Sequence, residues 1–291
     1  MPAQSRTGDM GVYLRPTTLS EALRHRAEGA VLLAGGTDFW PARVGKLAQS
    51  QADGRLLDLS AIGQLRGIES AGGDTLRIGA LTTWTDLADA HLPPALRALQ
   101  QAAREIGGRQ IQNRGTIGGN LCNASPAADG APPLLALDAA VELASVSGVR
   151  AVALSEFLVA PRQTALDETE VLTALLIPQP HREAVSHFIK LGARKYQLIS
   201  IVMGALVLRI EAGQVAHIAL AIGACSPVAR RLPALEAHLR GKPAADLEGH
   251  VTAAHLAPLA AIDDVRADAA YRRDAALVVV RRLLAAARGA A

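Results

Sequence analysis

Two uncharged, glycine-rich segments of the chain carry the groups best suited to binding an anion. They are AGGTD, at residues 34–38, and TIGGN, at residues 116–120. Glycine lets backbone N–H groups approach a ligand without an intervening Cβ, and hydroxyl and amide side chains add further donors. The side-chain donors in and beside the two segments are Thr37, Thr116, Asn120, Asn123 and Ser125. A single glycine pair most often marks a tight turn, but two such polar loops together predict a pyrophosphate clamp.

The common nucleotide-binding and metal-binding signatures do not occur in the sequence. It contains no G-x-G-x-x-G, and neither Gly45-Lys46 nor Gly241-Lys242 belongs to a G-x-x-x-x-G-K-S/T motif, which argues against a Rossmann dinucleotide site and a P-loop. The histidines stand singly, so we expect no metal site in this chain. Cys122 and Cys225 are far apart in sequence, which favours neither a disulfide framework nor a cysteine-ligated metal. We interpret Cys122 as a small buried side chain rather than a nucleophile.

Size and composition favour a two-domain protein of the reducing cytoplasm. The chain has 291 residues, of which 50% are hydrophobic, and a net charge of +3. Single hydrophobic cores stop growing at about 250–300 residues. The basic residues are not clustered and aromatic residues make up only 3%, so we do not expect nucleic acid as a partner. No uncharged apolar run reaches about 18 residues, so we expect no membrane span.

The first part of the chain alternates short apolar runs with amphipathic segments. Thr18-Leu-Ser-Glu21 has the form of a capping box, which predicts a helix start. Pro132 and Pro133 are expected to interrupt a later helix. The pattern predicts strands near 31–36, 55–60 and 75–80, helices near 18–27, 82–90, 94–106 and 128–140, and a hairpin that turns at Ser147-Gly148.

A polar, proline-rich stretch, PQPHRE at residues 178–183, marks the expected domain boundary. We therefore assign residues 1–178 to one domain and residues 179–291 to another. Beyond the boundary we expect three long strands near 186–196, 198–210 and 214–223, then helices near 227–240, 244–258 and 268–288. A small antiparallel sheet with helices on one side is the simplest architecture, so the fold class is α+β.

Three longer segments resemble one family of flavoprotein subunits. LLAGGTDF, NRGTIGGNLCNASPAAD and FIKLGARKY are similar to the FAD-binding, or medium, subunit of the molybdenum hydroxylases, the family of xanthine dehydrogenase and carbon monoxide dehydrogenase. The resemblance extends from YLRPTTLSEAL near the start to IDDVRADAAYRRDAALVVVRR near the end. It implies a fold of the vanillyl-alcohol-oxidase, or PCMH, type. An FAD-binding domain of two α/β subdomains would precede a small domain with a three-stranded antiparallel sheet and helices.

The resemblance also implies which residues contact FAD. By this resemblance, Asp129 matches a carboxylate near the ribityl or ribose hydroxyls of FAD. Leu172 matches a residue whose backbone contacts the isoalloxazine ring, and Lys190 matches a lysine beside the pyrimidine end of that ring. A cation there would stabilise the anionic reduced flavin and raise its potential. Tyr196 and Gln197 fall where the family has a mobile loop. The implied contacts are Leu32, Leu33, Ala34, Gly35, Gly36, Thr37, Asp38, Phe39, Thr116, Ile117, Gly118, Gly119, Asn120, Asp129, Leu172 and Lys190.

By the same resemblance, the chain is the FAD-carrying electron-transfer subunit of a molybdenum-containing dehydrogenase. Its partners would be a small subunit with two iron–sulphur (2Fe–2S) clusters and a large molybdopterin subunit, in a heterotrimer or a dimer of heterotrimers. Electrons would leave to NAD+, a quinone or another acceptor, and no residue of this chain is expected to act as an acid–base catalyst. Two alternatives stay open: a stand-alone flavin reductase or oxidase of the same fold, and an assembly protein that has lost the cofactor.

Overall fold

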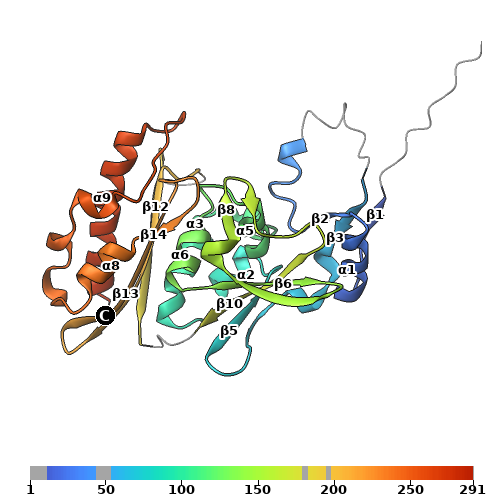
Figure 1. Cartoon of the computed structure of the whole chain (residues 1–291), viewed down its shortest axis with the longest axis horizontal. Coiled ribbons are helices and arrows are strands. Elements are labelled where there is room, and N and C mark those ends of the chain that lie inside the picture. Colours follow the sequence, from blue (N-terminus) through green and yellow to red (C-terminus); the bar gives the residue numbers. More distant parts are fainter. Residues whose placement is uncertain (1–11, 44–53, 179–182, 195–197, 291) are drawn as a thin grey trace, which may run out of the picture.

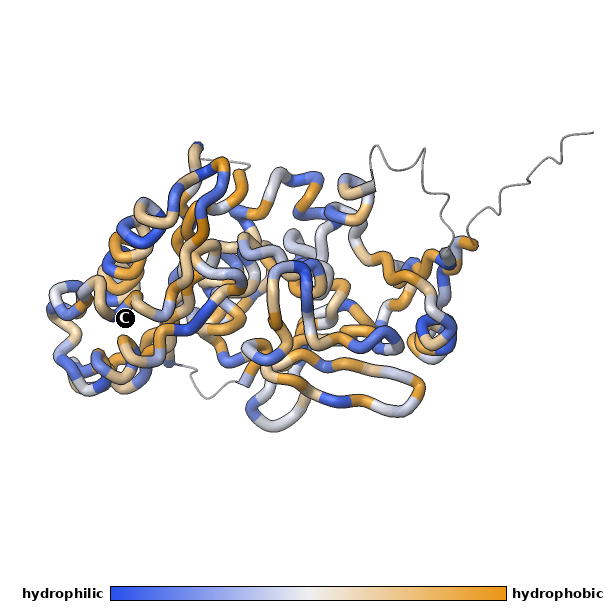
Figure 2. The backbone as a smooth tube through the Cα atoms, turned by 45° about the horizontal axis from the view of Figure 1, so that its top comes forward, coloured by the Kyte–Doolittle hydropathy of each residue, from blue (hydrophilic) through white to orange (hydrophobic). Residues whose placement is uncertain are grey.

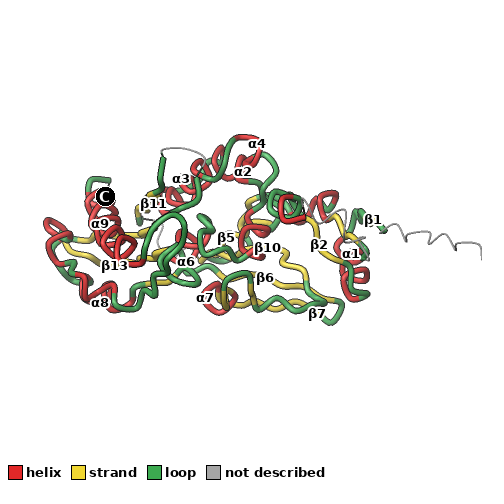
Figure 3. Tube along the Cα trace, turned by 90° about the horizontal axis from the view of Figure 1, so that it is seen from above, coloured by secondary structure: helices red, strands yellow, loops and turns green. Residues whose placement is uncertain are grey.

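The computed structural model describes residues 12–43, 54–178, 183–194 and 198–290. Tyr196 and Gln197, expected in a loop near the flavin, lie outside these residues. The described part is elongated, with the C-terminal helix α9 near one end and α1 near the other (Figure 1), and the same order is visible from above (Figure 3). Among the described residues, no helix combines the length and the hydropathy that a membrane span needs.

A three-stranded parallel sheet forms the N-terminal end of this structure. Its strands, in spatial order, are β1 (Tyr13–Leu14), β3 (Leu56–Asp58) and β2 (Val31–Leu33). Helix α1 (Leu19–Ala27) connects β1 to β2 and buries Ala22 completely. Thr18 caps this helix as predicted, since its hydroxyl accepts the Glu21 N–H at 3.3 Å. Because the three strands are parallel, the segments that follow them emerge at one edge, where ligands of such sheets usually bind.

A five-stranded antiparallel sheet follows. Its strands, in spatial order, are β4 (Ile68–Ser70), β5 (Thr75–Gly79), β10 (Val171–Pro178), β6 (Ala140–Ser145) and β7 (Gly148–Ala153). Strands β6 and β7 form the predicted hairpin, in which Ser145 pairs with Gly148. Helix α7 (Leu154–Phe157) and a small hairpin of β8 (Leu158–Ala160) and β9 (Gln163–Thr164) lead from β7 to β10.

Short helices between β5 and β6 join this sheet to the C-terminal part of the molecule (Figure 1). They are α2 (Trp84–Asp89), α3 (Arg97–Glu105), α4 (Arg109–Gln112), α5 (Ile117–Asn123) and α6 (Ala131–Ala136), with a 3-10 turn at Pro94–Leu96 between α2 and α3. Other 3-10 turns, nearer the N-terminus, are Pro41–Arg43, Leu59–Ala61 and Gly63–Leu65. Two of these helices differ from the prediction. TIGGN is not a loop, because Thr116 is the N-cap of α5 and the glycines lie inside that helix. Pro132 and Pro133 do not interrupt a helix but stand in the first turn of α6, where their missing N–H costs no hydrogen bond.

The C-terminal part is an antiparallel sheet covered by helices. Its strands are β11 (Val185–Leu191), β12 (Val202–Glu211), β13 (Gln214–Gly223) and β14 (Arg230–Arg231), so a two-residue edge strand joins the three that were predicted. Helices α8 (Pro233–Leu239) and α9 (Ala269–Arg288) pack on one face. The opposite face packs on α3 and α6, and Figure 1 shows the sheet between these two layers.

The helix expected at residues 244–258 is instead a series of 3-10 turns. They are Ala244–Asp246, Glu248–His250 and Ala253–Leu256. Side chains here bond to nearby backbone groups and compete with the helical pattern. The Asp246 carboxylate accepts the Gly249 N–H at 3.1 Å, and His255 Nδ1 accepts the Thr252 N–H at 3.1 Å.

The central strands of the C-terminal sheet are buried on both faces. Ala205 and Val207 of β12 belong to the core shared with α3 and α6, whereas Leu206 and Leu208 belong to the core under α9. This alternation is the two-residue period of a strand, and it explains the long hydrophobic stretches of these strands, which Figure 2 colours orange. The first of these cores contains residues from both sides of PQPHRE, so the two parts of the chain share one hydrophobic interior. The division into residues 1–178 and 179–291 stays a prediction.

Candidate functional site

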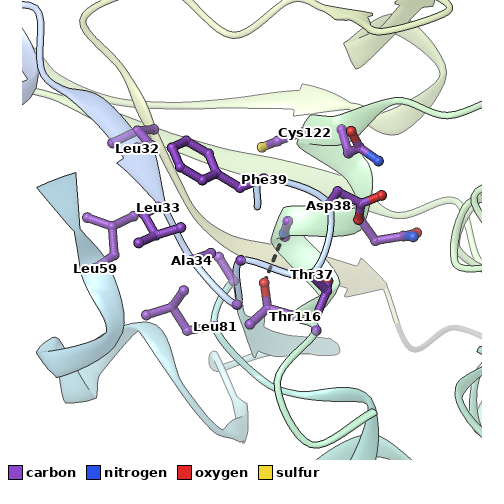
Figure 4. Close-up of a pocket in the computed structure, with 18 of the residues that line it drawn as sticks. Leu32, Leu33, Ala34, Thr37, Asp38, Phe39, Leu59, Leu81, Thr116 and Cys122 are labelled. Atoms are coloured by element: carbon purple, nitrogen blue, oxygen red, sulfur yellow. Dashed lines mark hydrogen bonds between the residues drawn. The ribbon is translucent and has the colours of Figure 1, made fainter. Parts of the chain in front are cut away.

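A cavity of about 420 Å³ opens between the parallel sheet and helix α5, within the range of about 300–1,000 Å³ that is usual for small-molecule sites. Figure 4 shows its labelled side chains, with Thr37 and Thr116 near one end and the Phe39 ring close to the Cys122 thiol. All but three of the predicted contact residues line it. The other lining residues come mainly from β3, the β5–α2 connection, α3–α4 and α5: Ala42, Leu59, Ala80, Leu81, Trp84, Ile106, Ile111, Gly115, Cys122, Asn123 and Val171.

The AGGTD segment follows β2 at the carboxyl edge of the parallel sheet and turns sharply along the cavity. Gly36 has a φ of +76°, which glycine adopts without strain, and the Trp40 indole packs against it. Among the described residues, the N–H groups of Gly35, Gly36, Thr37 and Asp38 donate to no protein acceptor. A run of backbone N–H groups on a glycine turn is a typical anion-binding concavity. This turn therefore supplies the backbone donors of the site.

The backbone amides of the TIGGN segment, which the sequence suggested as anion donors, are bonded within the protein. The N–H groups of Ile117, Gly118 and Asn120 donate to the carbonyls of Thr82, Ala80 and Thr116 at 3.0, 2.9 and 3.0 Å. The Gly119 N–H donates to Thr116 Oγ1 at 3.1 Å, the bond drawn in Figure 4. All four amides are thus already satisfied within the protein. The segment forms the wall opposite the turn. Thr116 and Asn120 contribute side chains to that wall, whereas Gly118 and Gly119 contribute none.

The glycines hold the two segments in direct backbone contact. A Cβ on Gly35 would lie 1.9 Å from the Arg114 carbonyl oxygen, just before TIGGN. A Cβ on Gly118 would lie 2.7 Å from Ala80 Cβ, so α5 approaches the β5–α2 connection closely. A Cβ on Gly119 would lie 2.8 Å from Thr116 Oγ1 and 3.8 Å from Ala34 Cβ, in the space between the turn and the helix. The two segments that the sequence singled out thus lie side by side at one cavity, although among the described residues only the AGGTD segment presents free amides.

Three predicted contact residues do not line the cavity. Ile117 is fully buried in the core. Asp129 and Lys190 pair with each other, with Lys190 Nζ 2.6 Å from Asp129 Oδ2. Ser200 Oγ donates to the other oxygen of Asp129 at 2.6 Å, and Lys190 Nζ also donates to the Glu105 carbonyl at 3.2 Å. Burial raises the pKa of Asp129, while Lys190 and Ser200 oppose that rise.

The ion pair nevertheless lies directly behind the cavity wall. Asp129 precedes Gly130, and a Cβ on Gly130 would lie 2.7 Å from the Trp84 ring and 2.8 Å from Asn120 Oδ1. Trp84 and Asn120 both line the cavity. The pair therefore ties the C-terminal sheet, through Lys190, to the segment that supports this wall.

Cys122 lines the cavity without becoming a nucleophile. Burial raises the pKa of its thiol to about 12. The thiolate is the reactive form of cysteine, so a protonated thiol presents only a small, polarisable surface to a ligand.

Comparison with known proteins explains this arrangement. Residues 5–180 match the model of the FAD binding domain in molybdopterin dehydrogenase. The chain belongs to this family of FAD-binding subunits. Residues 187–287 match the model of the CO dehydrogenase flavoprotein C-terminal domain. The FAD cofactor, the fold class and the assignment to the oxidoreductases of the xanthine dehydrogenase family are thereby confirmed.

Individual relatives agree with the family assignment. The xanthine dehydrogenase FAD-binding subunit of Escherichia coli is 36% identical over 227 residues, which cover 75% of each chain. The carbon monoxide dehydrogenase medium chain of Hydrogenophaga pseudoflava is 33% identical over 282 residues, covering 94% of this chain and 96% of the relative. A solved structure of carbon monoxide dehydrogenase from that organism superposes with a TM-score of 0.87 at 32% identity, and covers 96% of this chain and 98% of its own.

The described residues of this FAD subunit fit a dinucleotide. The turn of AGGTD offers phosphate oxygens backbone amides that have no acceptor in the described part of the chain, and the glycines of α5 leave space opposite them. Asn120 Oδ1 is buried and has no hydrogen-bond partner among the described residues. Phe39, Leu32 and Leu172 add apolar surface suited to a planar ring. The cavity thus has polar groups suited to the pyrophosphate of FAD and apolar side chains suited to its isoalloxazine ring.

Some residues that line the cavity were not predicted from the sequence. Leu59 follows β3, which is the parallel neighbour of β2, so its place at the same sheet edge could have been inferred. Trp84, Ile106 and Ile111 come from helix starts and ends that lie far from AGGTD in sequence, and nothing in their local pattern distinguishes them from core residues.

Replacing Gly35 by alanine is expected to separate the two segments. The new Cβ would overlap a backbone oxygen, which no side-chain rotation relieves. We expect a loss of about 3 kcal/mol in the free energy of unfolding, at the upper end for overpacking, together with weaker FAD binding. Denaturant unfolding of the flavin-free chain and FAD titration measure the two effects. Gly63→Ala is the matched control, because no atom lies within 4 Å of its Cβ, and unchanged unfolding of Gly35→Ala would contradict the contact.

Proposed function

We propose that this chain holds FAD in the cavity between AGGTD and α5 and serves as the electron-transfer subunit of a molybdenum-containing dehydrogenase. The observation that carries the proposal is the run of backbone amides from Gly35 to Asp38, which have no acceptor among the described residues and face Gly118 and Gly119 of α5 across the cavity. These amides bind the pyrophosphate, and Thr37 adds a hydroxyl donor. When bound, FAD supplies the exchange of electrons between one-electron and two-electron partners.

The chain's own residues position the cofactor rather than take part in proton transfer. Phe39, Leu32 and Leu172 pack against the ring and exclude water from it. The protonated Cys122 thiol adds apolar contact. A direct contact of Asp129 with the ribityl or ribose hydroxyls of FAD stays a prediction, and so does a contact of Lys190 with the isoalloxazine ring. The contact of Ile117 with FAD also stays a prediction.

The partners are inferred from the relatives. The matching proteins are described as FAD-binding subunits or medium chains, which supports assembly with other subunits. We propose a small iron–sulphur subunit and a large molybdopterin subunit as partners, in a heterotrimer or a dimer of heterotrimers. Electrons would pass from the iron–sulphur subunit to this chain and on to NAD+ or another acceptor. A cytoplasmic location is part of the same proposal.

Purification of the chain from its native source tests the proposal. We expect a yellow complex with the visible spectrum of oxidised flavin, which contains iron–sulphur and molybdopterin subunits identified by mass spectrometry. A yellow chain that purifies alone and oxidises a simple electron donor would favour a stand-alone reductase or oxidase. A colourless chain within the complex would favour an assembly protein that has lost its cofactor. Either result would overturn the electron-transfer assignment.

A further inference from the structure

The tip of the β8–β9 hairpin meets the C-terminal end of α5 at the edge of the cavity. The Arg162 N–H donates to the Ala124 carbonyl at 2.8 Å. The Arg162 guanidinium donates to the Asn123 carbonyl at 3.3 Å and also to the side-chain oxygen of Asn123. Asn123 is the last residue of α5 and lines the cavity. Arg162, which lies 39 positions further along the chain, therefore holds the Asn123 side chain in place at the cavity wall.

The chemistry of arginine decides which way the Asn123 amide points. A guanidinium has only donors, so the atom of Asn123 that faces it must be the oxygen. The amide nitrogen, with two N–H donors, therefore points away from Arg162, and it makes no hydrogen bond to the described residues. Because the residue lines the cavity, these donors are available to a ligand there.

The backbone at this contact is held in an uncommon conformation on both sides. Ala124 has a φ of +43° and Arg162 a φ of +64°, values that residues with a Cβ rarely adopt. The two residues are joined by the hydrogen bond between them. Such strain persists where the surrounding structure fixes it, and it gathers at ligand sites. In this conformation the Arg162 guanidinium bonds the last residue of α5.

We propose that Asn123 donates a hydrogen bond to an acceptor atom of the bound dinucleotide and that Arg162 is the positioning residue that presents this donor. The inference rests on the proposed function, because it places FAD in the cavity. Asn123 is four residues beyond Gly119, which is about 6 Å along a helix that rises about 1.5 Å per residue. The acceptor is therefore an oxygen or ring nitrogen of the part of FAD that extends beyond the pyrophosphate.

If Arg162 had only a structural role, its replacement would affect FAD binding in a different way. A basic side chain near a helix C-terminus can bond the last carbonyls and stabilise that helix alone. In that case, removal of Arg162 would weaken FAD binding equally whether or not Asn123 carries an amide. If Arg162 acts through the amide, its removal matters only while the amide is present.

A double-mutant cycle on the flavin-free, full-length chain separates the two roles. The Kd for FAD is measured by quenching of flavin fluorescence for the parent chain, Asn123→Ala, Arg162→Gly and the double variant. Arg162→Gly keeps the left-handed backbone, since glycine adopts it freely. We expect each single substitution to raise the Kd roughly three- to tenfold, as for the loss of one hydrogen bond, and the double variant to match Asn123→Ala.

Two further variants sharpen the test. Arg162→Lys keeps a donor-only side chain and is expected to retain most of the affinity. Asn123→Asp turns the donor toward the ligand into an acceptor and is expected to bind FAD more weakly than Asn123→Ala. Parent-like affinity of Asn123→Ala and Asn123→Asp, or fully additive effects in the cycle, would overturn the proposal. If the parent chain itself bound no FAD, the proposed function would fail first, so the two failures are distinguishable.

Discussion

Gly119→Asp protein is expected to fold normally and to bind FAD at least about 100-fold more weakly than the parent chain. Position 119 is the third residue of α5, whose N-cap is Thr116. An acidic side chain in the first turn of a helix is favourable, because it faces the positive end of the helix dipole. The new charge therefore does not destabilise α5. The Thr116 hydroxyl, 2.8 Å from the new Cβ, must shift slightly.

The loss of binding follows from where the carboxylate would lie. The Cβ of residue 119 points into the space between α5 and the AGGTD turn, 3.8 Å from Ala34 Cβ. A pyrophosphate held by the amides of Gly35 to Asp38 would meet that charge within a few ångströms. Two like charges about 4 Å apart repel each other by about 4 kcal/mol at the effective dielectric constant of a protein surface, which corresponds to several hundredfold in Kd.

Gly119→Asn is the matched control for Gly119→Asp. It has nearly the same shape and no charge, so it separates the steric from the electrostatic effect. We expect Gly119→Asn to bind FAD more weakly than the parent by about tenfold at most, as for the loss of a single favourable contact. The Kd from FAD titration and the flavin content after gel filtration check both variants. Equal, parent-like binding of the two would show that the pyrophosphate does not lie between the turn and α5.

The pair of glycine segments could be predicted from the sequence, but the helical state of one of them could not. Each glycine inside a helix costs about 1 kcal/mol relative to alanine, so TIGGN favours a loop when considered alone. The structure overrides this preference because Gly118 lets α5 pack within van der Waals contact of Ala80, which a larger residue prevents. This close approach depends on residues far apart in the sequence, so no local sequence pattern predicts it.

The capping and turn elements were predicted correctly because their signals are local. Thr18 caps α1 through the Glu21 N–H, and the β6–β7 hairpin turns where Ser147-Gly148 indicated. In contrast, the resemblance indicated Asp129 and Lys190 as separate flavin contacts, whereas the structure pairs them across 61 residues. Each is a charged residue that can be buried only with a partner, and the sequence does not state which partner.

Lys190→Met is expected to lower the free energy of unfolding by about 3–5 kcal/mol, the usual cost of removing one partner from a buried ion pair. The Lys190 and Asp129 side chains are only 4% and 9% exposed, so the Asp129 charge would be left in an apolar interior with Ser200 alone. The family resemblance implied instead that loss of this lysine would mainly lower the flavin potential. Because Asp129 already neutralises the Lys190 charge, we expect stability to change more than potential.

The pH dependence of the same variant has a definite sign. Burial raises the pKa of Asp129, and loss of Lys190 removes the largest opposing interaction. The native state of Lys190→Met then binds more protons than the unfolded chain, in which the pKa of aspartate is about 3.9. Its stability is therefore greatest at acidic pH and falls as the pH rises through the native pKa. Urea unfolding of the flavin-free chain at several pH values measures this slope.

The double variant Asp129→Leu with Lys190→Met shows whether the loss in the free energy of unfolding arises from the unpaired Asp129 charge. Replacing a whole buried ion pair by apolar side chains is often neutral, so we expect the double variant to regain most of the lost stability and to lose the added pH dependence. Arg109→Met is the surface control, since it breaks the exposed pair with Asp89 and should change stability by less than about 1 kcal/mol. If the double variant were as unstable as Lys190→Met, the deficit would come from lost packing behind the cavity wall, and the ion pair would not be what joins that wall to the C-terminal sheet.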